Sequence, residues 1–190
     1  MKVAIIGLGP TYSQAPFYDS DWELWGLPWH EGYWIHYDRL FEMHDLALLT
    51  STYSTRPKNY LERLKSIDVP LYMQEEYFFN VTPYPFDQIT PKYWNSSIAY
   101  MIALAIHENA EEIAVYGVDM KGDDEYGYQK PNIEYLLGLA EGRGIKVTIP
   151  EESPLLKFND SGIWFCNCKP RYQQRYGNIN GNHELLNASN

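Results

Sequence analysis

His44 and Asp45 are the pair of residues in this chain best suited to acid–base chemistry. They close an alternation of polar and apolar side chains over residues 39–44, which predicts a strand that ends near His44. An imidazole titrates near neutral pH, so a histidine at such a strand end can act as a general base or as a hydrogen-bond donor to a ligand. A histidine with a purely structural role is the competing interpretation, and the sequence leaves both open.

A glycine-rich loop follows the first apolar run of the sequence. It reads Gly-Leu-Gly-Pro-Thr, and its candidate nucleotide-binding residues are Gly7, Gly9, Pro10 and Thr11. Glycines let the backbone approach a phosphate closely, and backbone amides can hold the negative charge. The third glycine of the dinucleotide fingerprint would fall at Tyr12, which argues against a standard NAD or FAD site. The loop therefore predicts a phosphate site of another kind, and a tight turn that needs two glycines is the alternative.

A second candidate anion site lies at Asn95, Ser96 and Ser97. These residues precede an apolar helical pattern over residues 98–106 and form an N-cap signal. Hydroxyls and unpaired amides at a helix N-terminus attract phosphate groups. Simple capping of the helix explains the same residues equally well.

Asp119 is the candidate for a ribose or metal contact. It ends an apolar run over residues 112–118, and an acid at such a strand end can hold a ribose hydroxyl or Mg²⁺. In a metal-dependent variant, Asp119 and Asp45 would bind Mg²⁺ against the phosphates. A solvated acidic loop is the alternative. Cys166 and Cys168 with His183 offer too few ligands for a zinc site, so Mg²⁺ is the one cofactor that the sequence suggests.

The elements that must position these residues alternate between strand and helix patterns. We expect strands over residues 2–6, 22–27, 39–44, 69–73, 112–118 and 145–149, and helices over residues 57–65, 96–107 and 132–141. This alternation predicts an α/β fold, a single Rossmann-like domain with a mostly parallel sheet and helices on both faces. The domain would cover residues 1–157, followed by a C-terminal arm over residues 158–190. The aromatic, proline-rich segment 74–93 is expected to be a long loop that closes over the site.

Composition limits the partners of the chain. It has 15 Lys and Arg against 25 Asp and Glu, a formal net charge of −10, which makes duplex nucleic acid an unlikely partner. The longest apolar run is far shorter than the roughly 20 residues of a membrane span, and no signal peptide pattern opens the chain, so we expect a cytoplasmic protein. Seventeen tyrosines and six tryptophans are many for one domain core, and they favour a homo-oligomer.

The order of these features resembles two related families. Residues 2–11 are similar to the opening strand and Gly-x-Gly-Pro-Ser loop of the bacterial family 42 sialyltransferases, and equally to 6-hydroxymethylpterin diphosphokinase-like proteins. The helix start at residues 95–97, the strand end at Tyr116-Gly117-Val118-Asp119 and the segment 145–156 follow in the same order. Short phage-encoded proteins resemble this layout too, with a similar helix start at residues 130–135. The resemblance covers residues 1–157 and implies a Rossmann-like fold.

The resemblance also implies a site. In the sialyltransferases the glycine loop and the helix start hold a cytidine monophosphate, so Gly9, Thr11, Ser96 and Ser97 would contact the phosphate or ribose of a nucleotide. Those enzymes have a histidine base just before the penultimate helix, whereas residues 126–130 of this chain contain no histidine. Candidates to line that part of the pocket are Tyr126, Tyr128 and Gln129, with Tyr128 as a catalytic candidate. His44 is then the candidate to take over the role of base.

Three functions remain open at this point. The first is a nucleotide- or nucleotide-sugar-dependent transferase that moves a glycosyl or phosphoryl group to a small-molecule acceptor. The second is a non-catalytic protein that binds or sequesters a nucleotide, of phage origin in one version. The third is a hydrolase of a nucleotide or glycosidic bond, which differs from the first only in accepting water.

Overall fold

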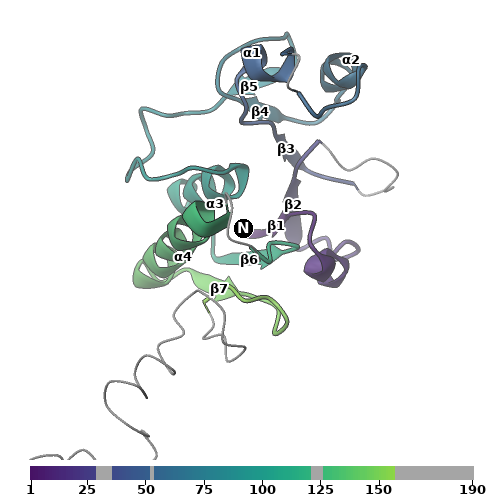
Figure 1. Cartoon of the computed structure of the whole chain (residues 1–190). Helices are drawn as coiled ribbons and strands as arrows, with labels where there is room; N and C mark the ends of the chain where they lie inside the picture. Colours follow the sequence, from purple (N-terminus) through teal and green to yellow (C-terminus); the bar gives the residue numbers. More distant parts are fainter. Residues whose placement is uncertain (29–35, 52–53, 121–125, 157–190) are drawn as a thin grey trace, which may run out of the picture. The chain divides into compact units, whose positions relative to one another are not determined.

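A parallel β-sheet forms the centre of the compact unit Met1–Leu155 (Figure 1). The computed structural model describes residues 1–28, 36–51, 54–120 and 126–156. A second unit covers Leu156–Asn190. Apart from residue 156 it lies outside the described residues, as do the expected C-terminal arm and Cys166, Cys168 and His183.

The sheet has seven strands in the described part of the chain, in the order β5-β4-β3-β2-β1-β6-β7, and every neighbouring pair is parallel. The strands are β1 (Lys2–Ile6), β2 (Trp22–Gly26), β3 (Arg39–Phe41), β4 (Leu71–Met73), β5 (Val81–Pro83), β6 (Glu112–Tyr116) and β7 (Lys146–Thr148). Strand β1, which lies between β2 and β6, is buried from Val3 to Ile6. Its run of apolar residues is typical of a strand that is covered on both faces.

The order of the strands places a topological switch point at β1. From β1 the chain adds β2, β3, β4 and β5 on one side, and then returns to place β6 on the other side of β1. The connections from β1 to β2 and from β6 to β7 therefore run to opposite sides of β1. In open parallel sheets, ligands bind outside the carboxyl ends of the strands at this point.

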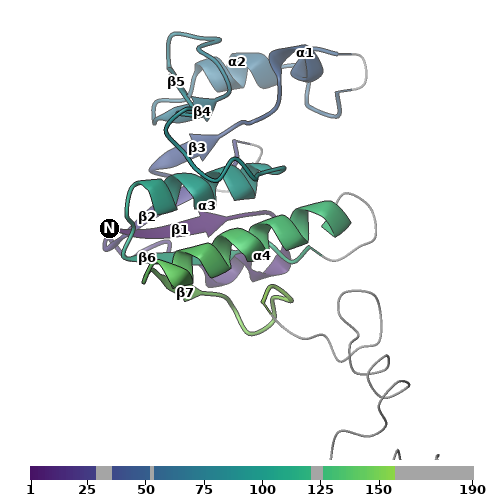
Figure 2. The ribbon, with the colours of Figure 1, turned by 90° about the vertical axis from the view of Figure 1, so that its left-hand side faces the viewer.

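Helices cover both faces of the sheet, as the sequence predicts. On one face, α3 (Ser97–His107) and α4 (Tyr126–Gly142) lie side by side in front of β1 and β6 (Figure 2). They pack on a core that includes Val3, Ile5 and Ile113. The other face is covered by three short helices: η1 (Pro10–Gln14), a 3₁₀ helix near β1 and β2, and α1 (Leu46–Leu49) and α2 (Tyr60–Lys65) near β4. The predicted fold class is thus confirmed.

The structure corrects two predicted boundaries that bear on the site. Strand β3 ends at Phe41 and not at residue 44, so His44 lies in the loop that follows the strand. Helix α4 begins at Tyr126, six residues before the expected start at 132, and contains Pro131 in its interior. A proline inside a helix removes one backbone hydrogen bond, which is why the sequence pattern favoured a later start. Leu136, Leu137 and other apolar residues of α4 are fully buried, and this packing outweighs the local cost of the proline.

The segment 74–93 also differs from the expectation of a lid. It contains the edge strand β5, and its residues Tyr84 and Phe86 pack against Tyr100 on α3. The Tyr84 hydroxyl donates a hydrogen bond to the Tyr100 carbonyl at 2.8 Å. This segment therefore extends the core over α3 in the described structure. None of its residues lines either of the two cavities described below.

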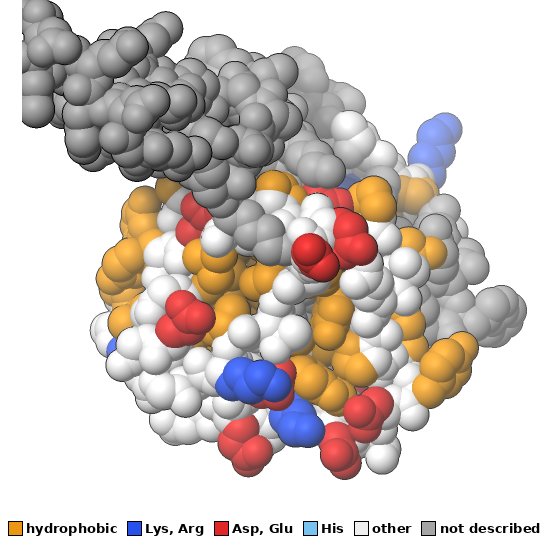
Figure 3. Space-filling view, turned by 90° about the horizontal axis from the view of Figure 1, so that it is seen from below, with side chains coloured by type: hydrophobic (Ala, Val, Ile, Leu, Met, Phe, Trp, Pro, Cys, Tyr) orange, Lys and Arg blue, Asp and Glu red, His pale blue; other side chains and the backbone are white. Residues whose placement is uncertain are grey.

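The surface and the helices bear on two of the expected partners. Within the described residues, none of the helices has the length and apolarity required to span a bilayer. On the face of the molecule shown in Figure 3, acidic side chains are scattered among apolar ones, and basic side chains form no continuous area. Such a face offers no basic groove for a duplex.

Candidate functional site

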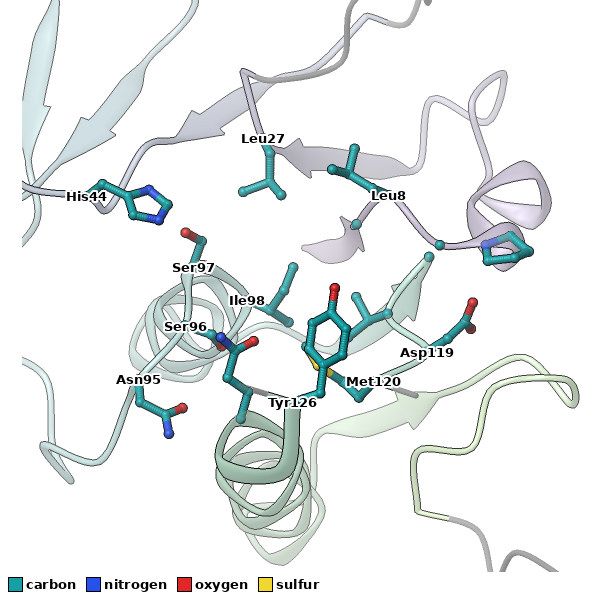
Figure 4. A pocket seen from close by; sticks show the side chains of 16 residues that line it. Leu8, Leu27, His44, Asn95, Ser96, Ser97, Ile98, Asp119, Met120 and Tyr126 are labelled. Atoms are coloured by element: carbon teal, nitrogen blue, oxygen red, sulfur yellow. The ribbon is translucent and has the colours of Figure 1, made fainter. Parts of the chain in front are cut away.

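A pocket opens at the switch point of the sheet, where the sequence places its candidate residues. Its walls come from the loops after β1, β2, β3 and β6 and from the first turns of α3 and α4 (Figure 4). Its volume is about 540 Å³. That value lies within the roughly 300–1,000 Å³ of small-molecule and cofactor sites. Among the predicted site residues, those that line it are Gly7, Gly9, Pro10, His44, Asn95, Ser96, Ser97 and Asp119.

The glycine loop is shaped by its contact with the loop after β6. The Gly7 N–H donates to the Tyr116 carbonyl at 2.8 Å, and the Gly9 N–H donates to the Gly117 carbonyl at 2.7 Å. A Cβ atom at Gly7 would overlap the Gly117 carbonyl oxygen, and one at Gly9 would overlap the Asp119 carboxylate. Gly117 itself has a φ of +65°, a conformation that favours glycine. The close packing of two loops is therefore sufficient reason for the glycines, and the same packing forms one wall of the pocket.

Thr11 lies behind this wall. It is 4% exposed and does not line the pocket. Its Oγ1 accepts a hydrogen bond from the Gly117 N–H at 2.8 Å and donates one to Asp119 Oδ1 at 3.3 Å. The structure thus places Thr11 where it holds the β6 loop and Asp119, whereas the sequence predicts a direct nucleotide contact.

Replacing Thr11 by valine should destabilise the protein, because the change keeps the shape of the side chain and removes both hydrogen bonds. Leaving the buried Gly117 N–H unpaired should lower the free energy of unfolding by about 1–3 kcal/mol. Urea unfolding measures the difference. Ser13→Ala is the matched control, because Ser13 is an exposed residue of the same 3₁₀ helix and should shift the free energy of unfolding by less than about 0.5 kcal/mol. Equal effects of the two substitutions would contradict the assigned role of Thr11.

The N-terminus of α3 supplies a second wall. The Ser96 side chain caps the helix by accepting from the Ala99 N–H at 3.2 Å, as the sequence predicts. The Ser97 and Ile98 amides belong to the first turn, whose N–H groups have no partner within a helix. Ser97 and Ile98 both line the pocket, so this turn presents hydrogen-bond donors and the positive end of the helix dipole to a bound anion.

Asn95 connects this wall to α4. Its side-chain Nδ2 donates to the Tyr128 carbonyl at 3.0 Å, and its backbone N–H donates to Asn132 Oδ1 at 3.1 Å. Asn132 is only 1% exposed and also donates to the Tyr93 carbonyl. Asn95 therefore fixes the spacing between the two helix starts in addition to lining the pocket.

Two of the three candidates in the first turns of α4 line the pocket, and the catalytic candidate Tyr128 is not one of them. Tyr126 and Gln129 lie three positions apart and share a helix face, and both line the pocket. Tyr128 is 78% exposed and does not line it. The catalytic interpretation of Tyr128 assumed a loop here, and the helical spacing directs that side chain elsewhere. Figure 4 shows the Tyr126 ring directed into the pocket.

Asp45 also lies away from the pocket. It is the N-cap of α1 and accepts a hydrogen bond from the Ala47 N–H at 2.6 Å. Asp119 lines the pocket, whereas Asp45 lines neither of the two cavities, so the structure does not bring together the carboxylates proposed for Mg²⁺. Among the described residues, no group of three or more His, Cys, Asp and Glu side chains is arranged to hold a metal ion. Asp119 keeps the ribose contact as its predicted role, and a contact to Mg²⁺ would come from this carboxylate without Asp45.

His44 lies at the opposite end of the pocket from Asp119, beside Ser97, with its ring turned toward the interior (Figure 4). A carboxylate that the sequence analysis missed stands behind it. Glu42 is 2% exposed, and its Oε1 is hydrogen-bonded to His44 Nδ1 and accepts from the His44 backbone N–H at 3.2 Å. The i, i+2 spacing of an acid and a histidine at a strand end is the signal that could have found this pair.

Two further residues hold the Glu42 carboxylate. The Tyr60 hydroxyl on α2 donates a hydrogen bond to Oε2, and Arg56 Nη2 lies 3.8 Å from the same oxygen. Burial acts to raise the pKa of Glu42, but the hydrogen bonds from His44 and Tyr60 and the charge of Arg56 outweigh it and lower the pKa below its ordinary value. Glu42 is therefore an ionised carboxylate at neutral pH. Burial and the same carboxylate raise the pKa of Tyr60, which stays a protonated donor.

A smaller cavity of about 170 Å³ adjoins the main pocket at this cluster. It is lined by Leu8, Leu27, Glu42, His44, Arg56 and Ser97. Leu8, Leu27, His44 and Ser97 line both cavities, so His44 stands at their common boundary. The site as a whole combines an anion-binding half, at the glycine loop and α3, with a half that holds a histidine backed by a buried carboxylate.

Comparison with known proteins agrees with the fold. The chain is similar to the sialyltransferase CstII from Campylobacter jejuni in complex with a substrate analogue, CMP-3FNeuAc. The TM-score is 0.51 and the identity 16%, over 80% of each chain. The sialyltransferase CST-II in complex with a trisaccharide acceptor and CMP gives a TM-score of 0.50 and an identity of 17%, over 81% of this chain and 82% of that chain. Monomeric CstII gives a TM-score of 0.50 and an identity of 14%, over 92% of this chain and 99% of that chain.

These likenesses define the class of fold: a Rossmann-like α/β domain of the kind found in the CstII sialyltransferases. At such low identities they show the fold alone. No family model and no curated protein sequence matches the chain. The resemblances to pterin diphosphokinase-like and phage proteins find no support among these structures.

Proposed function

We propose that this protein is a nucleotide-sugar-dependent glycosyltransferase that acts on a small hydroxyl-bearing acceptor. The observation that carries the proposal is the two-part site: an anion-binding wall and a carboxylate-backed histidine face a pocket large enough for a nucleotide-sugar. The fold likeness supports it, because structures with this fold were solved with a CMP-sugar analogue and with a trisaccharide acceptor and CMP.

In this proposal the phosphate of the donor lies at the first turn of α3. The amides of Ser97 and Ile98 would hold its charge, and the glycine loop would allow close approach from the other side. Asp119, which lines the pocket, would accept a hydrogen bond from a ribose hydroxyl. Tyr126 and Gln129 would close the pocket from α4.

His44 would act as the base, beside Ser97 and at the end of the pocket away from Asp119. The oxygen of the acceptor hydroxyl attacks the anomeric carbon of the sugar, and its proton passes to the His44 ring. The bond between that carbon and the phosphate oxygen breaks, and the nucleotide leaves with the bonding electron pair. The leaving phosphate is then held by the charge of the α3 N-terminus.

Product analysis tests this proposal against its alternatives. The protein is incubated with nucleotide-sugars, each with and without a panel of simple saccharides, and the products are identified by mass spectrometry. A glycosylated saccharide together with the free nucleotide is the expected result. Free sugar and nucleotide formed at the same rate with and without saccharides would show a hydrolase. Binding without any product would show a nucleotide-binding protein, and either outcome overturns the proposal.

A further inference from the structure

Glu42 is a carboxylate that is only 2% exposed, so its burial must be compensated by other groups. Transferring a carboxylate out of water costs several kcal/mol unless hydrogen bonds and opposite charge compensate. Here the donors come from separate parts of the chain: His44 beside it, Arg56 in the following loop and Tyr60 on α2. His44 and Tyr60 hydrogen-bond to the carboxylate, and the Arg56 guanidinium lies 3.8 Å from it. An apolar residue at this position would fill the core at lower cost.

The partners of the ring determine its tautomer. His44 Nδ1 lies against Glu42 Oε1 and 3.4 Å from Arg56 Nη2. An ionised carboxylate can only accept hydrogen bonds, so a hydrogen bond to Glu42 requires the proton to be on Nδ1. The alternative, with Nδ1 accepting from Arg56, would direct a lone pair at the closer, negatively charged oxygen. The Nδ1–H tautomer is therefore favoured, and it leaves Nε2 as the unprotonated nitrogen.

We propose that Glu42 is the positioning residue of this site: it fixes His44 in the Nδ1–H tautomer, so that Nε2 can take the proton of the acceptor hydroxyl. The inference rests on the proposed function and deepens it. When Nε2 takes the proton, the imidazolium that forms lies against the Glu42 carboxylate, which stabilises the new charge. The smaller cavity, bounded by Leu8, Leu27 and Arg56, is the space in which that hydroxyl would lie.

Nitrogen NMR of the imidazole rings tests the inference without any substrate. In the ¹⁵N-labelled protein at a pH where His44 is neutral, Nδ1 should show the shift of a protonated nitrogen and Nε2 that of an unprotonated one. In Glu42→Leu the acceptor is gone, and the ring should move to the Nε2–H tautomer that free histidine favours. His44→Gln assigns the signals. An Nε2–H ring in the unmodified protein, or the same tautomer in both, would overturn the inference.

Two further variants separate positioning from stability. Tyr60→Phe removes one hydrogen bond to Glu42 but keeps the carboxylate, so the Nδ1–H tautomer should persist. Glu62→Leu, on the exposed face of α2, is the matched control for Glu42→Leu and should change neither tautomer nor turnover. If the protein proves to be a transferase, Glu42→Leu should lower kcat by about tenfold or more, with little change in the KM for the nucleotide-sugar. If the tautomer shifts in Glu42→Leu and kcat is unchanged, the catalytic half of the inference is overturned. If the unmodified protein shows no turnover, the proposed function is overturned instead.

Discussion

Replacing His44 by glutamine should lower the rate of glycosyl transfer by roughly 10²–10⁴-fold, the usual contribution of a general base. The affinity for the nucleotide-sugar should change by less than about threefold, a difference of under 1 kcal/mol, since the backbone amides of α3 and the glycine loop that would hold the donor are unchanged. Glutamine keeps the polarity and approximate size of the side chain. Steady-state kinetics and titration calorimetry measure the two quantities on the same preparation.

The control for this variant is His107→Gln. His107 is an exposed residue at the last position of α3, and the change should leave both turnover and affinity as they are. Turnover that survives in His44→Gln would exclude His44 as the base. If affinity fell in parallel with turnover, His44 would be a ligand-binding residue, and a nucleotide-binding protein without catalysis would become the better account.

Replacing Glu42 by glutamine should reduce the stability of the protein at neutral pH by about 3 kcal/mol, because it breaks a buried charged cluster. The effect should depend on pH. Hydrogen bonds and the charge of Arg56 overcome the effect of burial and lower the pKa of Glu42 from its ordinary value of 4.5. A group whose pKa is depressed by folding contributes its full stabilisation above the pKa of the unfolded chain and loses it as the pH falls through the folded value.

The difference between the two proteins should therefore shrink as the pH falls below about 4.5. Denaturant unfolding at several pH values measures it. Glu62→Gln, at an exposed position on α2, is the control and should show a difference below about 0.5 kcal/mol at every pH. A stability difference for Glu42→Gln that is independent of pH would contradict an ionised Glu42 in the folded protein.

Much of the fold and of the nucleotide half of the site could be predicted from local sequence. Residues 2–6 are a run of apolar, β-prone residues before two glycines, and the structure has β1 at the same positions. The cap at Ser96 precedes a continuous apolar pattern, and α3 begins at the next residue. Both features depend on neighbours along the chain. Their convergence on one pocket follows from parallel topology, which brings strand ends to one edge of the sheet.

The parts that were missed depend on contacts between distant residues. Nothing near Glu42 in the sequence indicates that Tyr60 and Arg56 will compensate its burial, so a buried carboxylate could not be anticipated. Pro131 suggested that α4 begins later than it does, so the sequence could not separate Tyr128, which does not line the pocket, from Tyr126 and Gln129, which do. Thr11 was predicted to contact a ligand, whereas its hydroxyl holds the loop after β6. That loop is more than one hundred residues away along the chain, so the sequence around Thr11 gives no sign of the contact.

Cytoplasmic location and self-association stay predictions. The exposed aromatic rings of Tyr93 and Tyr135, which contact each other edge to face, fit the expectation of a homo-oligomer without testing it. Light scattering at micromolar concentration would test the predicted self-association.

The central claim is that the pocket beside the glycine loop and α3 binds the anionic part of a nucleotide-sugar. Calorimetric titration of nucleotide-sugars into the unmodified protein, Leu8→Glu and Leu48→Glu tests it most directly. Leu8 lines the pocket and is 50% exposed, whereas Leu48 lies on α1 with 51% exposure, so both changes add one negative charge at a half-exposed leucine. We predict binding to the unmodified protein and to Leu48→Glu, and binding about tenfold or more weaker to Leu8→Glu because of charge repulsion. Equal affinity in all three proteins, or no binding to the unmodified one, would contradict the account.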